Sequence, residues 1–125
     1  MIKIDILGVK TVQAEHLVLD YNGTLAVDGN LIQGAAEMLN ALSGKIMIHV
    51  ITADTFGKVR ENLKSVNCEL VVIMGHGQTA QKNDFITKLG KDSVIAIGNG
   101  ANDALMLKNA AIGIALIQKE GACPN

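Results

Sequence analysis

Nearly continuous apolar runs alternate with segments of helical character, and this alternation constrains the fold more than any other feature of the sequence. Strands that are apolar along their whole length are buried on both faces, and the helices between them provide the cover. We therefore predict an α/β, Rossmann-like core in three layers: a mostly parallel sheet with helices on both faces. The apolar runs cover residues 16–19, 46–51, 70–74, 94–98 and 112–117.

Three of the intervening segments are predicted to be helical. One extends over residues 78–89 and ends at Gly90, a residue type that favours the left-handed conformation after a helix. A shorter helix is predicted over residues 102–109. The remaining segment has a candidate N-cap at Asp54 or Thr55. Its apolar residues recur at helical spacing at Phe56, Val59, Leu63 and Val66.

The N-terminal residues show a different pattern. Ile2, Ile4 and Ile6 alternate with polar residues, which is the period of a half-buried strand. With a turn over residues 8–13, this segment is predicted to be an N-terminal antiparallel edge strand of the main sheet. The 125 residues contain no Pro- or Ser-rich linker, so we predict a single domain, 1–125.

The charge balance and the cysteine content exclude several classes of partner. The chain contains eleven Lys and Arg residues and twelve Asp and Glu residues. It has no Trp, and aromatic residues make up 2% of it. Neither nucleic acid nor an anionic membrane is therefore expected as a partner. The two cysteines form no C-x-x-C pair, the N-terminus lacks the apolar core of a signal peptide, and no run has the length of a membrane span. We expect a reduced, cytoplasmic protein.

Polar side chains stand where the predicted strands end. Asp20 ends the first apolar run, Thr52 follows the second, Lys82 lies early in the helix after the third, and Asn99 and Asp103 follow the fourth. Sites in parallel sheets lie beyond the carboxyl ends of the strands, so these groups are expected to converge. A carboxylate can attack phosphorus, while a lysine, a hydroxyl and Mg²⁺ can neutralise phosphoryl oxygens. The pattern therefore favours phosphoryl transfer.

Four motifs carry a resemblance to a known family. DYNGTL (20–25) resembles the first motif of the haloacid dehalogenase (HAD) superfamily, which is usually D-x-D-G-T. Thr52 matches the second motif, Lys82 the third, and GNGAND (98–103) the fourth. The stretch 81–116 is also similar to the phosphorylation domain of P-type ATPases, and the match extends from about residue 17 to residue 116. The resemblance implies a HAD-like hydrolase of the soluble, P-type ATPase-like kind, without ion transport.

The resemblance also implies roles for individual residues, with Asp20 as the nucleophile that forms an aspartyl-phosphate and Mg²⁺ as the cofactor. The implied catalytic residues are Asp20, Asn22, Thr52 and Lys82. The implied phosphate-binding residues are Asn22, Gly23, Thr52, Ala53, Lys82 and Asn102, and Gly23 allows a sharp turn whose amide can face an anion. The implied metal ligands are Asp20, the backbone carbonyl of Asn22, Asn99 and Asp103.

Two positions depart from the superfamily pattern. Asn22 replaces the second aspartate of D-x-D, which protonates the leaving group, and an amide cannot carry that proton. Asn99 replaces an acid that ligates the metal, so Mg²⁺ is expected to bind more weakly. P-type ATPases carry threonine at the first of these positions. We expect a slow or specialised phosphohydrolase for a phosphorylated small molecule or a phosphoprotein. The alternative is a catalytically degenerate module that binds phosphate or a protein.

The spacing between the motifs leaves no room for a cap domain. The spans 24–33 and 52–82 are both too short to hold one. Relatives without a cap act on large substrates or close their sites by association, so we expect a homo-oligomer.

Each candidate also has a purely structural interpretation. Asp20 suits a turn, Thr52 a helix cap, Asp103 the first turn of a helix, and Lys82 a solvated helix face. The three histidines (His16, His49 and His76) are expected to be core or surface residues rather than ligands.

Two other families use similar parts but fit less well. A response-regulator receiver needs an acidic pair well upstream of the phosphorylated Asp, and only nineteen residues precede Asp20. A dinucleotide site could use Gly98, Gly100 and Glu120. Asp103 stands where the third glycine of that motif belongs, and its charge would repel a pyrophosphate.

Overall fold

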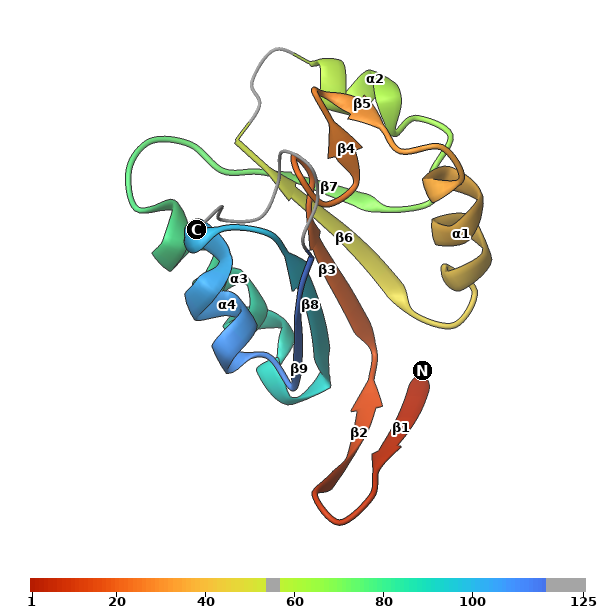
Figure 1. Cartoon of the computed structure of the whole chain (residues 1–125), viewed down its shortest axis with the longest axis vertical. Helices are drawn as coiled ribbons and strands as arrows, with labels where there is room; N and C mark the ends of the chain where they lie inside the picture. The colour runs from red at the N-terminus through yellow and green to blue at the C-terminus, as the bar shows by residue number, and fades with distance from the viewer. Residues whose placement is uncertain (54–56, 117–125) are drawn as a thin grey trace.

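The central sheet of the computed structural model has five parallel strands in the order β7-β6-β3-β8-β9. The structure describes residues 1–53 and 57–116, apart from the side chain of residue 101. The first strand of this sheet along the chain lies at its centre, with later strands added on both sides (Figure 1). The strands are β3 (His16–Asp20), β6 (Met47–Thr52), β7 (Glu69–Val72), β8 (Val94–Gly98) and β9 (Ile112–Ala115).

Helices cover both faces of this sheet, as the sequence predicts (Figure 1). One face packs against α1 (Ala35–Leu42) and α2 (Lys58–Asn62), and the other against α3 (Gln78–Leu89) and α4 (Ala104–Asn109). Two short 3-10 turns, η1 (Lys91–Ser93) and η2 (Ala101–Asp103), precede β8 and α4. The predicted three-layer α/β architecture is therefore confirmed. No helix in the described part of the chain has the length and apolar character needed to cross a bilayer.

Alternation along the strands divides the core into two layers. In β3, Leu17 and Leu19 belong to the cluster under α1 and α2, whereas Val18 belongs to the cluster under α3 and α4. Successive side chains of a strand point to opposite faces, so both faces need apolar cover. Helix α4 packs closely against β9 because Gly113 of β9 has no side chain. A Cβ at Gly113 would lie 2.0 Å from the carbonyl oxygen of Leu107 in α4.

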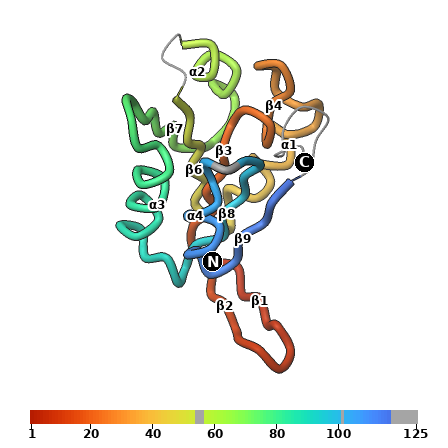
Figure 2. Tube along the Cα trace, turned by 60° about the vertical axis from the view of Figure 1, so that its left-hand side comes forward, coloured from red at the N-terminus to blue at the C-terminus, as the bar shows by residue number. Residues whose placement is uncertain are grey.

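The N-terminal strand is antiparallel, but it does not extend the main sheet. β1 (Ile2–Ile6) pairs with β2 (Lys10–Ala14) in a two-stranded sheet of its own. The turn predicted over residues 8–13 is shorter than expected, because β2 takes up most of that range. This hairpin projects from the body and leads directly into β3 (Figure 2). Its alternating pattern reflects one face turned to the core, which sequence alone could not assign to a particular sheet.

A second hairpin follows the first motif and was not predicted. β4 (Ala26–Val27) and β5 (Asn30–Leu31) are joined by Asp28 and Gly29, whose φ angles are +54° and +82°. Two consecutive positive φ angles are the signature of a type I′ turn, for which Asp-Gly is a preferred pair. No cap domain lies between β3 and α1, as expected.

Other element boundaries differ modestly from the predictions. The helix predicted around residues 56–66 is the short α2, and its proposed N-cap at Asp54 or Thr55 lies outside the described residues. The third strand begins at Glu69 and ends at Val72, two residues before the predicted end. Residues 78–89 form α3 as predicted, and Gly90 ends it with φ of +100°.

Candidate active site

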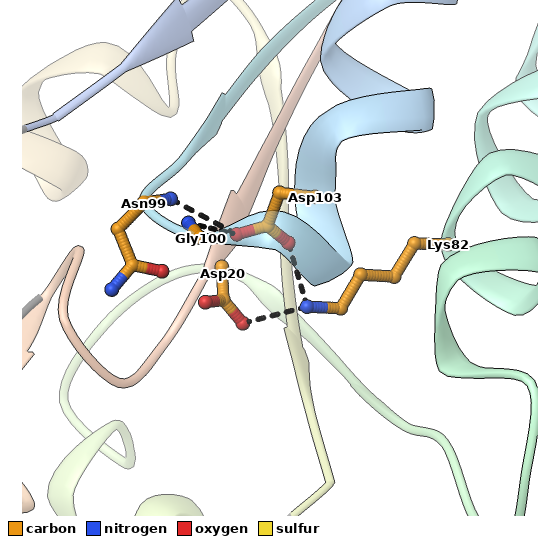
Figure 3. Close-up of polar contacts among 5 residues, drawn as sticks. All are labelled: Asp20, Lys82, Asn99, Gly100 and Asp103. Carbon is orange, nitrogen blue, oxygen red and sulfur yellow. Dashed lines mark hydrogen bonds and ion pairs between the residues drawn. The ribbon is translucent and has the colours of Figure 1, made fainter. Parts of the chain in front are cut away.

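Asp20, Lys82 and Asp103 converge at the carboxyl end of the sheet. The Lys82 ammonium donates to Asp20 Oδ1 at 3.1 Å and to Asp103 Oδ1 at 2.6 Å (Figure 3). Lys82 is 4% exposed and Asp103 only 1%. One lysine therefore joins the end of β3 to η2, and the three groups come from segments that are distant in sequence.

The topology explains why these groups meet. Strands are added to either side of β3, so the crevice at the carboxyl end of β3 is the switch point where open α/β sheets bind ligands. α3 carries Lys82 toward this crevice from one covered face. Asp20 itself is the last residue of β3.

The fourth motif holds the Asp103 carboxylate in place. Asp103 Oδ2 accepts the backbone N–H of Asn99 at 2.9 Å and that of Gly100 at 3.4 Å (Figure 3). Gly98 lies so close that a Cβ there would be 2.5 Å from Asp103 Oδ2. The glycine before Asn99 is therefore needed for close approach of the carboxylate, and not only for a turn.

Burial and charge determine the protonation of the cluster. Burial raises the pKa of Asp20 to about 6, and the negative charge of Asp103 adds to this effect while Lys82 opposes it. Burial lowers the pKa of Lys82, but the two carboxylates outweigh it and leave the pKa above its usual value. Two acidic side chains therefore share a single cation.

A cavity of about 350 Å³ opens onto this cluster. It brings together nearly all of the residues that the sequence selected, including Thr52 from β6 and the two amides that replace acids. Gln78, at the start of α3, is an additional polar residue that sequence reasoning missed, because nothing in its local pattern marks it. The lining residues are Asp20, Asn22, Thr52, Ala53, Gln78, Lys82, Asn99, Gly100, Asn102 and Asp103.

Gly23 is the member of the predicted set whose role requires correction. We expected its backbone amide to face an anion, but the amide donates to the Ala26 carbonyl at 2.8 Å. Its φ of +79° supports the expected turn. The amide is satisfied inside the turn because residues 21–26 fold back on themselves. Gly23 lies instead at a neighbouring cavity of about 320 Å³, which Asp28 and Gly29 also line.

The oxygen donors at the site fit a magnesium ion. Mg²⁺ in proteins uses one or two carboxylates and keeps several waters or phosphate oxygens. Asp20 and Asp103 supply two carboxylates, and Asn99 lines the same cavity. Within residues 1–53 and 57–116, no group of three or more His, Cys, Asp or Glu side chains could hold a metal.

The histidines lie away from this cavity, as expected. His49 Nδ1–H donates to Glu69 Oε1 at 2.6 Å, and His49 Nε2 shares a hydrogen bond of 3.0 Å with His16 Nδ1. His49 is 3% exposed and meets the edge of Phe85. None of the three histidines lines the cavity at Asp20.

Comparison with known sequences finds relatives among lipid-transporting ATPases. The chain is 33% identical over 85 residues to phospholipid-transporting ATPase tat-1 of Caenorhabditis elegans, a match covering 64% of this chain and 7% of that protein. It is 31% identical over 121 residues to phospholipid-transporting ATPase ID of Mus musculus, covering 90% and 10%. The chain thus spans a tenth or less of the length of these ATPases. No family model matches the chain.

A shorter relative is covered almost completely. Uncharacterized protein MJ0072 of Methanocaldococcus jannaschii is 41% identical over 39 residues, which make up 31% of this chain and 89% of that protein. The chain therefore belongs to one family with this archaeal protein.

Comparison with solved structures identifies the fold. The 3-deoxy-D-manno-octulosonate 8-phosphate phosphatase of Moraxella catarrhalis, solved with magnesium, phosphate and its sugar acid, has a TM-score of 0.70 and 16% identity, covering 89% of this chain and 70% of that one. A HAD subfamily III A hydrolase of Legionella pneumophila has a TM-score of 0.71 and 17% identity, covering 90% and 68%. The fold of this chain is that of the HAD hydrolases.

Proposed function

We propose that this chain, which has the fold of the HAD hydrolases, is a Mg²⁺-dependent phosphohydrolase that acts through an aspartyl-phosphate on Asp20. The observation that carries the proposal is the contact of one buried lysine with two carboxylates at the switch point of the sheet. The similar phosphatase of Moraxella catarrhalis was solved with magnesium and phosphate bound, which supports the same chemistry.

Asp20 is the nucleophile in this proposal. One of its carboxylate oxygens forms a bond to phosphorus while the bond from phosphorus to the leaving oxygen breaks, and the leaving group takes up a proton. Water then attacks the phosphorus of the aspartyl-phosphate, which releases phosphate and restores Asp20. Because only the ionised carboxylate attacks, the raised pKa of Asp20 opposes reaction at acidic pH.

Lys82 and Thr52 hold the phosphoryl group. Lys82 already lies against the nucleophile, and its positive charge stabilises the oxygens on which negative charge develops. Thr52 lines the same cavity at the end of the neighbouring strand, together with Ala53 and Asn102.

Asp20, Asp103, Asn99 and the backbone carbonyl of Asn22 would hold Mg²⁺ at this site. When bound, the ion neutralises charge on the transferred phosphoryl group. Because Asn99 replaces an acid that ligates the metal in the superfamily pattern, we expect weaker magnesium binding than a site with more carboxylates would give.

The amide at position 22 affects the choice of substrate. Without a proton donor there, substrates with good leaving groups, such as phosphoanhydrides and acyl phosphates, are favoured over alkyl monoesters. The open cavity, and the lack of a cap domain among the described residues, suit a phosphorylated small molecule or a phosphoprotein. Closure of the site by a second copy of the chain, and action in the cytoplasm, complete the proposal.

The test is turnover of a broad panel of phosphate esters, acyl phosphates and nucleotides by wild type and by Asp20→Asn, with Mg²⁺ titrated to high concentration. We expect release of phosphate by wild type that requires Mg²⁺ and is lost in Asp20→Asn. Equal phosphate release by the two proteins would contradict the proposal.

A second candidate is a module that binds phosphate without turnover, and the amides at Asn22 and Asn99 favour it. Retention of phosphate or a phosphate analogue, with no turnover across the whole panel, would support this alternative.

A further inference from the structure

The hairpin after the first motif places a carboxylate beside the two amides that replace acids. A cavity of about 320 Å³ is lined by Asn22, Gly23, Asp28, Gly29 and Asn99. Asn22 and Asn99 also line the cavity at Asp20, so the two cavities adjoin. Among the described residues that line this second cavity, Asp28 alone is ionisable. A carboxyl group therefore lies near the position where Asn22 supplies none.

Partly buried hydrogen bonds connect the tip of this hairpin to the residue that follows the nucleophile strand. The Tyr21 hydroxyl donates to the Gly29 carbonyl at 3.1 Å, and the Asn62 amide donates to both the Tyr21 hydroxyl (3.0 Å) and the Gly29 carbonyl (3.1 Å). Tyr21 is fully buried and directly follows Asp20. The hairpin tip therefore has a fixed position relative to the nucleophile, which is what a proton-transfer group requires.

The turn by itself requires a small polar residue but not an acid. Asp28 has φ of +54°, and both Asn and Asp accept this conformation before Gly in a type I′ turn. Exchange of Asp28 for Asn should therefore preserve the hairpin while removing the proton carrier. This makes the backbone role and the chemical role of Asp28 separable by experiment.

We propose that Asp28 is the general acid and base of the reaction, in place of the acid missing at Asn22. The proposal rests on the phosphohydrolase function proposed above. Protonated Asp28 gives its proton to the leaving oxygen as the bond from that oxygen to phosphorus breaks. The Asp28 carboxylate then takes a proton from the water that attacks the aspartyl-phosphate, directly or through one bridging water.

The groups that face the hairpin tip come from three elements. Lys58 of α2 lies against it, with its Nζ 3.3 Å from the place where a Cβ of Gly29 would be. Tyr21 approaches from the end of β3, and the amides of Asn22 and Asn99 lie across the cavity.

The test compares Asp28→Asn with wild type on aryl and alkyl phosphates of graded leaving-group pKa. Loss of general acid catalysis should lower kcat about 10²–10⁴-fold on poor leaving groups. For substrates with good leaving groups, such as acyl phosphates, the rate of the bond-breaking step should change far less. The pH profile of kcat on poor leaving groups should also lose its alkaline limb, which a purely structural role would not produce.

Two further variants make the test specific. Asn22→Asp introduced into Asp28→Asn should restore turnover of poor leaving groups, because it returns an acid to the superfamily position. Asp5→Asn is the matched control, because it neutralises an exposed Asp on the other hairpin, β1–β2. The Thr11 hydroxyl donates a hydrogen bond to Asp5 there. It should behave as wild type.

The outcomes distinguish the role proposed for Asp28 from the phosphohydrolase function on which it rests. Unchanged kcat in Asp28→Asn, with Asp20→Asn inactive, overturns the role of Asp28 and leaves the phosphohydrolase intact. An equal fall on all leaving groups, without rescue by Asn22→Asp, also overturns it. A wild type that hydrolyses none of the substrates overturns both proposals.

Discussion

Two clusters of ionisable side chains lie toward opposite ends of the same sheet, and they differ in how their charges are satisfied. Toward the amino end, His16, His49 and Glu69 form a linear chain of hydrogen bonds. At the carboxyl end, Lys82 lies between Asp20 and Asp103. Both clusters join residues from separate segments of the chain. Lys82 and Asp103 are buried in one cluster, whereas only His49 is buried in the other.

The balance of charge separates a structural cluster from a reactive one. In the histidine cluster, the Glu69 carboxylate accepts a hydrogen bond from the His49 ring, and the other ring nitrogen of His49 is paired with His16. In the lysine cluster, two carboxylates share one cation, and the pKa of Asp20 is raised to about 6. Cavity volume would favour the histidine cluster instead. The cavity beside His49 and Glu69 measures about 440 Å³, whereas the cavity at Asp20 measures about 350 Å³. The sharing of one cation by two acidic side chains, rather than cavity volume, identifies the candidate active site.

The largest expected effect is on removal of the shared cation. Lys82→Met should lower the free energy of unfolding by about 3–5 kcal/mol at neutral pH, because it leaves buried carboxylates without their partner. Urea unfolding measures this, and the loss should be smaller near pH 4, below the raised pKa of Asp20, where that side chain is protonated and uncharged. A variant as stable as wild type at both pH values would show that the cluster carries no such imbalance.

A smaller loss is expected in the histidine chain. His49→Leu removes two hydrogen bonds from a buried position and should cost about 1–3 kcal/mol, measured by the same unfolding experiment. Phosphate release per folded molecule should stay at the wild-type level. A fall in that activity as large as the fall in Lys82→Met would erase the distinction between the two clusters.

Glu69→Gln should have a still smaller effect. The side chain of Glu69 is 58% exposed, and the glutamine oxygen can still accept from His49. The expected loss is below about 1 kcal/mol. Thermal unfolding of Glu69→Gln and His49→Leu, measured side by side, checks which variant loses more stability. A larger loss in Glu69→Gln would show that the hydrogen bonds of the two histidines depend on the charge of Glu69.

The smallest effect is a dependence of stability on pH. Burial, together with the neighbouring His49, lowers the pKa of His16 below 6.5. Below pH 6.5 the unfolded chain binds more protons at this residue than the native protein does. Stability from this source is therefore present above pH 6.5 and lost as the pH falls through the native pKa. The difference in unfolding free energy between wild type and His16→Asn should shrink on acidification; a constant difference would contradict this.

Much of the fold follows from the sequence because apolar runs and strand ends are local signals. The parallel strands, α3 and its stop at Gly90 follow from periodicity and from a single glycine. The separate N-terminal sheet does not, because the pairing of β1 depends on β2, whose polar residues obscure a strand. The β4–β5 hairpin is also missed, since its strands have only two residues each.

The candidate site is predictable to a similar degree. Asp20, Thr52, Lys82 and Asp103 stand at strand ends or within motifs, and the topology brings them together. Asp28 and Gln78 lie outside any motif, and their place at the cavities depends on a turn and on a helix start. The hydrogen bonds from His49 to His16 and Glu69 connect separate strands, so no local pattern reveals them.

The most direct test of the central claim is capture of a phosphoryl analogue at Asp20. Fluorine NMR of the protein with beryllium fluoride should show a bound, Mg²⁺-dependent complex in wild type and in His49→Leu, and none in Asp20→Asn. An equal bound signal in Asp20→Asn, or a bound signal in wild type that does not require Mg²⁺, would contradict the assignment of the carboxyl end of the sheet as the reactive site.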